Sequence, residues 1–439
     1  MDSINVVGGG LAGSEAAFFL AQRGIEVRLW EMRPKKMTPV HRTGNMAELV
    51  CSNSLKSELP STAQGLLKHE MKIMGSLLLE CAETARVPAG SALAVDRDFF
   101  SVLVTRRLEN HPRITVINEE LIQLPQGEIT VVATGPLTSD SLSEVIKEHG
   151  GEENLHFYDA VAPSITEESI NKDIAFKASR YGKGSDDYYN CPFNREQYEH
   201  FYSCLLEADI NEGHTIDKKM FFSGCMPIEV MARRGKDTLR FGPMRPVGLE
   251  GENGSRAHAV VQLRQEDRDG HIYGLVGFQT RLKWGEQDRI FRLIPGLENA
   301  EFVRYGVMHR NTYLNSPRLL LPTLQFHPQP EVIFAGQVTG VEGYMESAAT
   351  GIFAAINAER LLRGEKPVSL PVESMLGSLV NFVTMADSNN FQPINANFGI
   401  LPLLPDPPRE KKVRYEQYVQ RAIQAMTKFS ELYITQVVK

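Results

Sequence analysis

Two cysteines stand in settings that could make a thiol reactive. The first, Cys51, lies in residues 47–56, AELVCSNSLK, where the serines and the asparagine after it are typical of helix starts. A thiol at a helix N-terminus has a lowered pKa and therefore a larger share of nucleophilic thiolate. The alternative is a small buried hydrophobe, which is the more common fate of a cysteine. The residues alone leave both interpretations open.

The second cysteine, Cys225, precedes a run of cations. It lies in residues 221–229, FFSGCMPIE, where a glycine and a proline predict a turn. Residues 225–246 hold five cations and two carboxylates, a local charge of +3 in a chain whose net charge is −7. One interpretation is a solvated charged loop. The other is a phosphate-binding rim beside a thiol that attacks a nucleobase in RNA. The cations are Arg233, Arg234, Lys236, Arg240 and Arg245.

A glycine-rich turn at the start of the chain predicts the scaffold for this chemistry. Residues 4–17, INVVGGGLAGSEAA, indicate a buried strand, a turn and a helix start, with the spacing G-x-G-x-x-G. The three glycines permit a tight turn, the approach of a pyrophosphate, and close packing of helix on strand. The free N–H groups of the helix start would hold the phosphates. The candidate phosphate-binding residues are Gly8, Gly9, Gly10, Leu11, Ala12 and Gly13.

The context of the turn favours an adenine dinucleotide over an ordinary strand-to-helix turn. A second predicted strand, residues 26–30, ends at Glu31, which is 21 residues after Gly10 and suited to the ribose hydroxyls. A late strand, residues 332–336, is followed by more glycines and a helix over 347–362. An NAD dehydrogenase would not need this return, so FAD is favoured. Further cofactor candidates are Gly135, Gly336, Tyr344 and Gly351, and either His309 or Tyr344 could stack on a ring or be a packed core residue.

The predicted fold is α/β, a Rossmann-like FAD-binding domain of the two-dinucleotide-fold type with an inserted α+β domain. Apolar spacing predicts one helix over 62–81, and Asp96 is expected to cap a helix that runs to Glu109. Strands are expected over 114–117 and 129–133, and a charged helix over 409–430. The expected domains are 1–165 and 326–439 for the two parts of the FAD-binding domain, the second with a helical C-terminus, and 166–325 for the insertion.

Composition narrows the class of protein further. The chain has 439 residues, 42% hydrophobic and 23% charged, enough for two or three domains with sizeable cores. Five cysteines without a C-x-x-C argue against a disulfide framework and a zinc ribbon, and no histidine spacing predicts a metal. No apolar run approaches the ~20 residues of a membrane helix, and the opening motif leaves no room for a signal peptide. We therefore expect a reduced, cytoplasmic protein without a membrane partner.

The chain resembles the TrmFO family, the folate- and FAD-dependent tRNA (uracil-5-)-methyltransferases of bacteria. The resemblance runs over the whole length, and the Cys51 and Cys225 blocks are its specific parts. Two small departures are Ser91, where the family has glycine, and Arg42, where it has a second histidine. The blocks that carry the resemblance are residues 6–17, 47–56, 92–97, 190–192, 224–229, 240–244, 277–280, 336–351 and 390–399.

The resemblance implies an activity and roles for both cysteines. NAD(P)H would reduce FAD, and the one-carbon unit of 5,10-methylenetetrahydrofolate would pass by way of reduced FAD to C5 of uridine 54 in the tRNA T-loop. Cys225 would be the nucleophile at uracil C6 and Cys51 the base, although which of the two takes which role stays open. The cations Arg233, Arg234, Lys236 and Arg240 would hold the tRNA. No obligatory protein partner is predicted, and the folate-binding residues, the NADH or NADPH preference and the oligomeric state are left open.

Three other functions are alternatives to this methyltransferase activity. A GidA-like enzyme of the tRNA wobble uridine shares FAD and the folate carbon, but that family is longer and lacks the block at 47–56. A flavin oxidoreductase for small molecules would not need the thiol beside a basic run. A non-catalytic RNA-binding flavoprotein is the third. The position of a folate-derived label in RNA would separate all of these.

Overall fold

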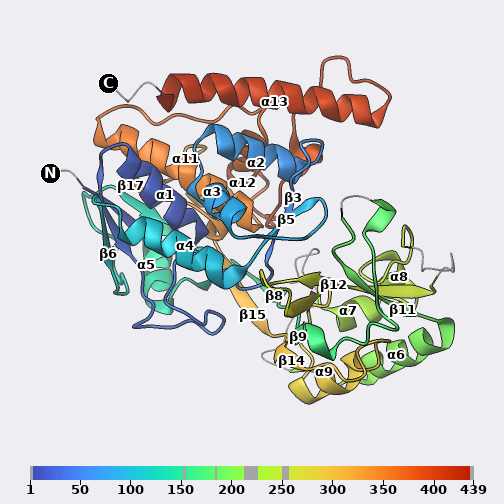
Figure 1. Ribbon diagram of the computed structural model, residues 1–439. Coiled ribbons are helices and arrows are strands. Elements are labelled where there is room, and N and C mark those ends of the chain that lie inside the picture. Colours follow the sequence, from blue (N-terminus) through green and yellow to red (C-terminus); the bar gives the residue numbers. More distant parts are fainter. Residues whose placement is uncertain (1–2, 152–154, 183–184, 212–225, 250–256, 436–439) are drawn as a thin grey trace.

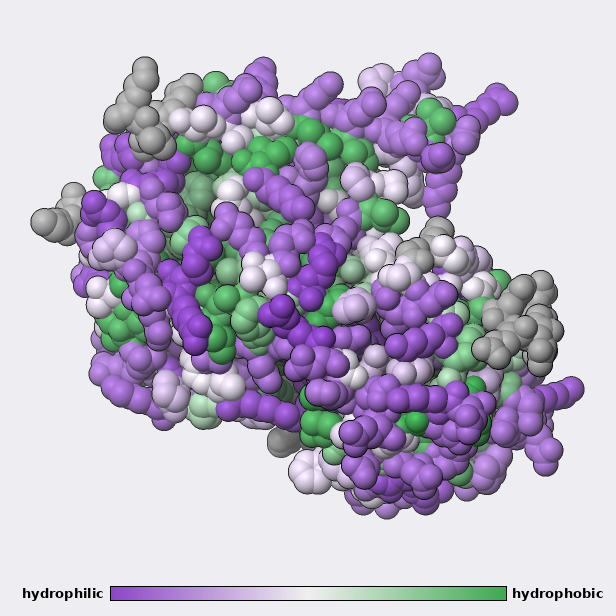
Figure 2. Space-filling view, viewed as in Figure 1, coloured by the Kyte–Doolittle hydropathy of each residue, from purple (hydrophilic) through white to green (hydrophobic). Residues whose placement is uncertain are grey.

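The fold has two lobes with separate hydrophobic cores (Figure 1). It is seen in a computed structural model that describes residues 3–151, 155–182, 185–211, 226–249 and 257–435. The larger lobe combines the N-terminal and C-terminal parts of the chain, and the smaller lobe is formed by the middle. Hydrophilic residues dominate the visible surface of both lobes, interrupted by hydrophobic groups below the C-terminal helix (Figure 2).

The larger lobe is built on a six-stranded sheet of order β16-β17-β7-β1-β2-β6. All neighbours are parallel except β16 and β17. The late strand β17 pairs with β7, so the return of the chain to the first sheet is confirmed. Such a parallel sheet with helices packed on it is the expected doubly wound type. The strands are β1 (Ser3–Val7), β2 (Glu26–Trp30), β6 (Ile114–Ile117), β7 (Thr130–Val132), β16 (Gln325–Phe326) and β17 (Gln329–Phe334).

Helices α1 and α11 pack along one another beside this sheet (Figure 1). Their approach depends on Gly351, because a Cβ there would lie 2.1 Å from the carbonyl oxygen of Ala12. The C-terminal helix α13 lies across the top of the lobe and buries one stripe, which includes Ala422 and Met426. The helices are α1 (Leu11–Gln22), α2 (Ala63–Ile73), α3 (Leu77–Thr84), α4 (Arg97–Glu109), α5 (Asp140–Gly150), α10 (Ser316–Leu319), α11 (Tyr344–Leu362), α12 (Met375–Met385) and α13 (Lys411–Tyr433).

The prediction of a single helix over residues 62–81 is wrong. The chain forms α2 and α3 instead, because Gly75 adopts a left-handed φ of +81° and Ser76 then caps α3 by accepting the N–H of Leu79. Both helices bury apolar faces in the same core, which is why one periodic pattern ran through the break. The prediction that Asp96 caps the next helix, α4, is confirmed by its bond from the Phe99 N–H.

The smaller lobe is an antiparallel sheet covered by short helices. Its strand order is β10-β11-β12-β13-β9-β14. Helices α6 and α9 each bury apolar residues in the second core, with Phe201 and Phe291 fully enclosed. The strands are β9 (Ser164–Thr166), β10 (Phe176–Lys177), β11 (Tyr189–Phe193), β12 (Ala259–Gln265), β13 (Ile272–Leu275) and β14 (Phe302–Arg304), and the helices are α6 (Arg195–Glu207), α7 (Ile228–Ala232), α8 (Thr238–Phe241) and α9 (Trp284–Phe291).

A two-stranded antiparallel ribbon connects the lobes: β8 (Leu155–Ala160) leads into the smaller lobe and β15 (Met308–Tyr313) leads out. Ile165 already belongs to the smaller core, whereas Leu314 and Leu324 belong to the larger one. We therefore place the passage between the cores at this ribbon, and residues 314–325 with the larger lobe. A third sheet, β3-β5-β4, consists of β3 (Ser54–Ser57), β5 (Ala92–Val95) and β4 (Arg86–Val87).

In the part of the chain that the structure describes, no helix is both long and apolar enough to cross a membrane.

Candidate active site

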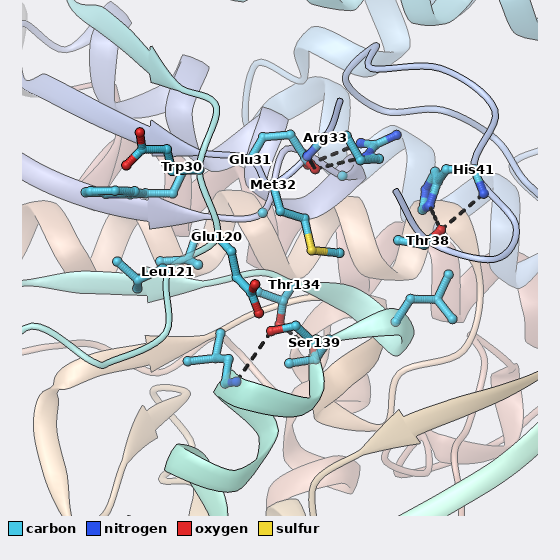
Figure 3. Close-up of a pocket in the computed structure, with 17 residues that line it drawn as sticks. Trp30, Glu31, Met32, Arg33, Thr38, His41, Glu120, Leu121, Thr134 and Ser139 are labelled. Carbon is cyan, nitrogen blue, oxygen red and sulfur yellow. Dashed lines mark hydrogen bonds and ion pairs between the residues drawn. The ribbon is translucent and has the colours of Figure 1, made fainter. Parts of the chain in front are cut away.

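The glycine turn forms one wall of a pocket at the carboxyl ends of β1 and β2 (Figure 3). Gly8 has a φ of +100°, and a Cβ at Gly13 would lie 1.8 Å from the carbonyl oxygen of Gly8, so both glycines are needed by the backbone itself. A Cβ at Gly10 would meet no protein atom within 4 Å. Packing therefore does not explain that glycine, whereas a ligand lying against it would. Gly10 also precedes α1 without a capping side chain, so phosphate oxygens can serve as acceptors there.

Glu31 lines the same pocket, as predicted from its place after the second strand. One carboxylate oxygen accepts the Gly9 N–H at 2.8 Å, and the other accepts the backbone N–H and the guanidinium of Arg33, both at 2.9 Å. Burial raises the pKa of Glu31, but these bonds outweigh burial and the pKa stays below its usual value. The carboxylate thus stays charged and rigid. Thr134 and Ser139 face it from the other side of the pocket (Figure 3).

A second cavity opens next to the first, since Leu137 lines both. It is bounded by the Cys51 loop, by the turn of residues 135–137 after β7, and by the start of α11. Gly343 precedes α11 with no side-chain cap, so the positive end of this helix faces the cavity. Gln279 of the smaller lobe and Asn311 of the ribbon complete the wall. The two cavities are thus neighbours, with Leu137 between the glycine turn and the Cys51 loop.

The other predicted cofactor glycines are Gly135, which follows β7, Gly336, which follows β17, and Gly351, which lies in α11 against α1. Gly135 and Gly336 have φ values of +68° and +82°, which only glycine adopts readily. Gly336 lies at the end of β17, where an added Cβ would come within 3.0 Å of the Ala12 Cβ. Gly351 and Ala12 form the helix contact described above. Gly135, Gly336 and Gly351 line neither cavity, and what the structure shows of them is their backbone geometry and their close packing.

Cys51 lies in the second cavity, but the helix expected after it is absent from the described structure around it. Residues 54–57 form strand β3 instead. The loop is held by Tyr344, whose hydroxyl accepts the N–H groups of Cys51 at 2.8 Å and Ser52 at 3.1 Å. Burial, and secondly the nearby Cys51, raise the pKa of Tyr344, so its phenol remains neutral. The predicted cofactor candidate Tyr344 is thus in the cavity and also fixes the thiol-bearing backbone.

Arginines from both lobes surround the Cys51 loop. Arg304 donates to the carbonyl of Val50 at 3.4 Å, and Arg264 donates to the hydroxyl of Ser52 at 2.7 Å. Arg97 of α4 bonds to Glu266, which also lies 3.8 Å from Arg304. Burial and, secondly, the charge of Arg97 together lower the pKa of Arg304 to about 10. Burial likewise raises the pKa of Glu266, but Arg97 and Arg304 outweigh it and keep this carboxylate ionised.

A lysine–glutamate pair forms the opposite side of the cavity. Lys56 lies 3.1 Å from the carboxylate of Glu346, which is 1% exposed in α11 and also accepts the N–H of Ala396. Lys68 is buried nearby, where burial lowers its pKa to about 8. These residues were not among the candidates predicted from the sequence, and neither were Gln279, Asn311 and Asn395. Most of them stand inside sequence blocks that carried the family resemblance, which was the available signal.

The basic rim lies on the smaller lobe, around α7 and α8. Arg233 donates to the carbonyl of Leu206, Lys236 pairs with Glu199, and Arg240 pairs with Asp237. Arg233, Arg234 and Lys236 are exposed, and Arg240 is half-buried. Cys225 lies outside the described residues, and so does the side chain of His309. The nearest described structure after Cys225 is α7, where the Ile228 N–H bonds to the carbonyl of Gln279, a residue of the Cys51 cavity.

Metal chemistry has no support in the described residues, which contain no group of three histidine, cysteine or acidic side chains able to hold an ion. Cys81 and Cys191 are buried among apolar side chains, and burial raises the pKa of Cys81 to about 11. These thiols are inert. The described part of the site therefore consists of the pocket at the glycine turn, a neighbouring cavity that holds one thiol and, next to that cavity, a cluster of arginines.

Comparison with known proteins agrees with this geometry. Residues 3–366 match the sequence profile of the family described as "Glucose inhibited division protein A". "Methylenetetrahydrofolate--tRNA-(uracil-5-)-methyltransferase TrmFO" of Syntrophomonas wolfei is 62% identical over 98% of this chain and 99% of its own length. The protein of the same name in Bacillus subtilis is 54% identical over 98% and 99%.

A solved structure supports the fold independently of close sequence similarity. Aquifex aeolicus GidA superposes with a TM-score of 0.72 at 17% identity, over 98% of this chain and 73% of that one. This likeness is one of fold, whereas the near full-length identities above are those of one family. The chain therefore belongs to the glucose inhibited division protein A family and, within it, to the methylenetetrahydrofolate--tRNA-(uracil-5-)-methyltransferases TrmFO.

Proposed function

We propose that this chain transfers the one-carbon unit of 5,10-methylenetetrahydrofolate to C5 of a uridine in tRNA, the uridine at position 54 of the T-loop, and so forms 5-methyluridine. The names of its relatives give the reaction class. The observation that carries the proposal within this chain is the pair of neighbouring cavities, one lined by the glycine turn and the other by Cys51, with Leu137 common to both. A flavin oxidoreductase of small molecules would need the first cavity but no thiol in the second.

The residues present fit FAD. The open face of Gly10 and the uncapped start of α1 suit its pyrophosphate, Glu31 suits a ribose, and the start of α11 faces the cavity for the ring. Once bound, and reduced by NAD(P)H, FAD supplies the electrons and delivers the one-carbon unit. The chain's own work is to hold this group, exclude water and activate the uracil.

Activation of the uracil needs a nucleophile, because C5 of uracil is itself a poor one. We assign this role to Cys225, whose thiolate would add to C6 and leave the electron pair on C5. After C5 has formed its bond to the carbon, its proton must leave. Cys51, as thiolate, would take that proton. The electron pair left at C5 would break the bond between the transferred carbon and its carrier, and two electrons and a proton, which the bound cofactor would supply, would complete the methyl group. The thiolate of Cys225 would then leave C6 as the C5–C6 double bond forms again.

A backbone hydrogen bond at the start of α7 supports the proposal that both thiols reach one substrate. The Ile228 N–H, three residues after Cys225, bonds to the Gln279 carbonyl at 2.8 Å, and Gln279 lines the cavity of Cys51. Arg304 and Arg264 bond to Val50 and Ser52, the residues on either side of Cys51, and so place cations beside that loop. The base would have to leave the RNA stack to reach this depth.

The phosphates of the same RNA would lie on the basic rim, formed by Arg233, Arg234, Lys236 and Arg240. Phosphate contacts position a nucleic acid without reading its sequence. The rim belongs to the smaller lobe, and the overall charge of the chain is negative, so the attraction is local.

The test uses purified protein, T-loop RNA, NADPH and folate labelled in its methylene carbon. Cys225→Ala is expected to keep FAD and lose methyl transfer together with any covalent RNA adduct. Cys51→Ala is expected to slow transfer by about 10²–10⁴. Cys204→Ala, at a half-exposed thiol of α6, is the matched control and should leave the rate unchanged.

Each rival predicts a different product. Label in a wobble uridine would indicate the GidA-like reaction, and NADPH oxidation without labelled RNA would indicate a small-molecule oxidoreductase. Normal turnover by Cys225→Ala would remove this residue from the mechanism.

A further inference from the structure

Phe241, the last residue of α8, has 83% of its surface exposed. Single exposed hydrophobic residues are common and need no explanation by themselves. This one stands on the smaller lobe between cations, so its surroundings decide what it does. It lines an open groove on the outside of α7 and α8.

The exposure of Phe241 is a consequence of how its segment is anchored. Leu239 and Met244 are fully buried in the smaller core, and the Met244 N–H bonds to the Leu239 carbonyl. Arg240 fixes the same turn by donating to the carbonyl of His258 at 2.9 Å and pairing with Asp237. With both apolar neighbours inside, the phenyl ring is presented outward on a rigid base.

The groove around the ring is basic and shallow. Arg234, Lys236 and Thr238 line it, and Asp237 is the one carboxylate among the described lining residues. Asp237 is already engaged by Arg240, and Lys236 is paired with Glu199, whereas Arg234 has no ion pair among the described residues. The apolar end of the groove is formed by Met231 and Met226. Met226 is the residue that follows Cys225 in the chain.

We infer that Phe241 stacks on an unpaired nucleobase of the tRNA, while Arg234 and Lys236 hold the phosphates that flank it. An aromatic ring between cations is the arrangement that binds single-stranded nucleic acid, because every base offers a π-face and every linkage a charge. An apolar protein partner would not account for the cations. The inference rests on the proposed function, and it adds a stacking contact to a rim that otherwise binds only phosphates.

The groove of Phe241 also contains Met226, the residue after Cys225, and this position suggests a role for the stacking contact. A base that leaves the loop of the tRNA abandons its stacking partners. A phenyl ring at the far end of a groove that leads to Met226 replaces one of those partners for a neighbouring base. Phe241 thus stabilises the opened loop without taking part in the chemistry.

The test measures affinity of the FAD-loaded enzyme for a T-arm stem-loop by fluorescence anisotropy at several salt concentrations. Phe241→Ala is expected to weaken binding about 5- to 150-fold, the range for loss of one stacked base, with the salt dependence unchanged. Phe241→Trp should restore binding. Arg234→Gln should instead reduce the slope of log affinity against log salt by about one. Leu403→Ala, at an 82% exposed leucine of the larger lobe, is the matched control.

A direct readout is 2-aminopurine, placed in turn at each loop position. One position is expected to be quenched on binding by the wild type and by Phe241→Trp, and to stay bright with Phe241→Ala. Unchanged affinity and quenching for Phe241→Ala, in an enzyme that still methylates the RNA, would overturn the inference and leave the proposed function intact. A wild type that neither binds nor labels the stem-loop would overturn both.

Discussion

The two lobes make their parts of the site from different material. The larger lobe forms its cofactor pocket largely from backbone, namely glycines, strand ends and the uncapped starts of α1 and α11. The smaller lobe uses side chains: arginines beside the Cys51 loop, and a basic groove with an exposed phenyl ring. A backbone site is intolerant of added atoms, whereas a side-chain site is intolerant of lost charge. The lobes should therefore fail in different ways, and substitutions can measure the difference.

The largest effect is expected from a single added carbon in the larger lobe. In Gly13→Ala the new Cβ would lie 1.8 Å from the carbonyl oxygen of Gly8. The Cβ is fixed to the helix backbone and the oxygen is part of the turn, so neither can move away without opening the turn. We expect a loss of about 5 kcal/mol or more in the free energy of unfolding, and protein without FAD. Urea denaturation and the visible absorbance of the flavin measure these two effects.

The matched control adds the same carbon three residues earlier. Gly10→Ala meets no protein atom, and the φ of Gly10, −72°, suits alanine. The apoprotein should keep its stability or gain about 0.4–1 kcal/mol, while affinity for FAD falls. Normal FAD affinity in this variant would show that the phosphates lie elsewhere.

The next effect comes from charge beside the Cys51 loop. Glu266→Gln removes the carboxylate that balances Arg97 and Arg304, which are 16% and 12% exposed in their side chains. Buried cations left without a partner should cost about 3–5 kcal/mol of stability. Glu286→Gln, which breaks the exposed pair with Arg289 on α9, should cost at most about 1 kcal/mol. Equal losses in urea for the two variants would contradict the contrast.

The smallest effect is expected at Glu70, a buried carboxylate of the larger lobe. Unlike Glu266, it is held by backbone N–H groups, with no cation among the causes of its pKa shift. Glu70 accepts the N–H groups of Met375 and Leu376 at the start of α12, and burial raises its pKa to about 8. Between pH 4.5 and 8 the folded chain holds a proton that the unfolded chain has lost, so stability falls as pH rises through 8. Between pH 7 and 9 this loss is about 1.4 kcal/mol.

Glu70→Gln removes the titrating proton and leaves other groups in place. The difference in unfolding free energy between pH 7 and 9 should therefore be smaller in the variant than in the wild type by that amount. An identical pH dependence in both proteins would show that Glu70 is ionised throughout.

The same contrast explains what the sequence could predict. Glycine spacing and strand ends are local, so Gly8–Gly13 spacing, Glu31 and the return of β17 to the sheet were all visible in the chain. Even the break between α2 and α3 had a local signal, Gly75 followed by Ser76, which the longer apolar period concealed.

The surroundings of Cys51 were not visible, because they depend on residues far away in the sequence. Asn53 looked like a helix cap, but its amide donates to the carbonyls of Val95 and Gln265 and so joins the two lobes. Arg97 lies on α4, Arg264 on β12 and Arg304 on β14. In the sequence each of them resembles an ordinary surface charge. Only the fold gathers them.

The ribbon of β8 and β15 also has a consequence for how the chain reaches its native topology. Val131 pairs with Ile333 about 200 residues later, a long loop to close. Once the middle of the chain has folded by itself, Ala160 and Met308 are already neighbours, and the open loop shrinks to about 50 residues. By the logarithmic law of loop closure this lowers the entropic barrier by about 1.2 kcal/mol. If the smaller lobe folds first, it lowers the entropic cost of assembling the sheet on which the cofactor site depends.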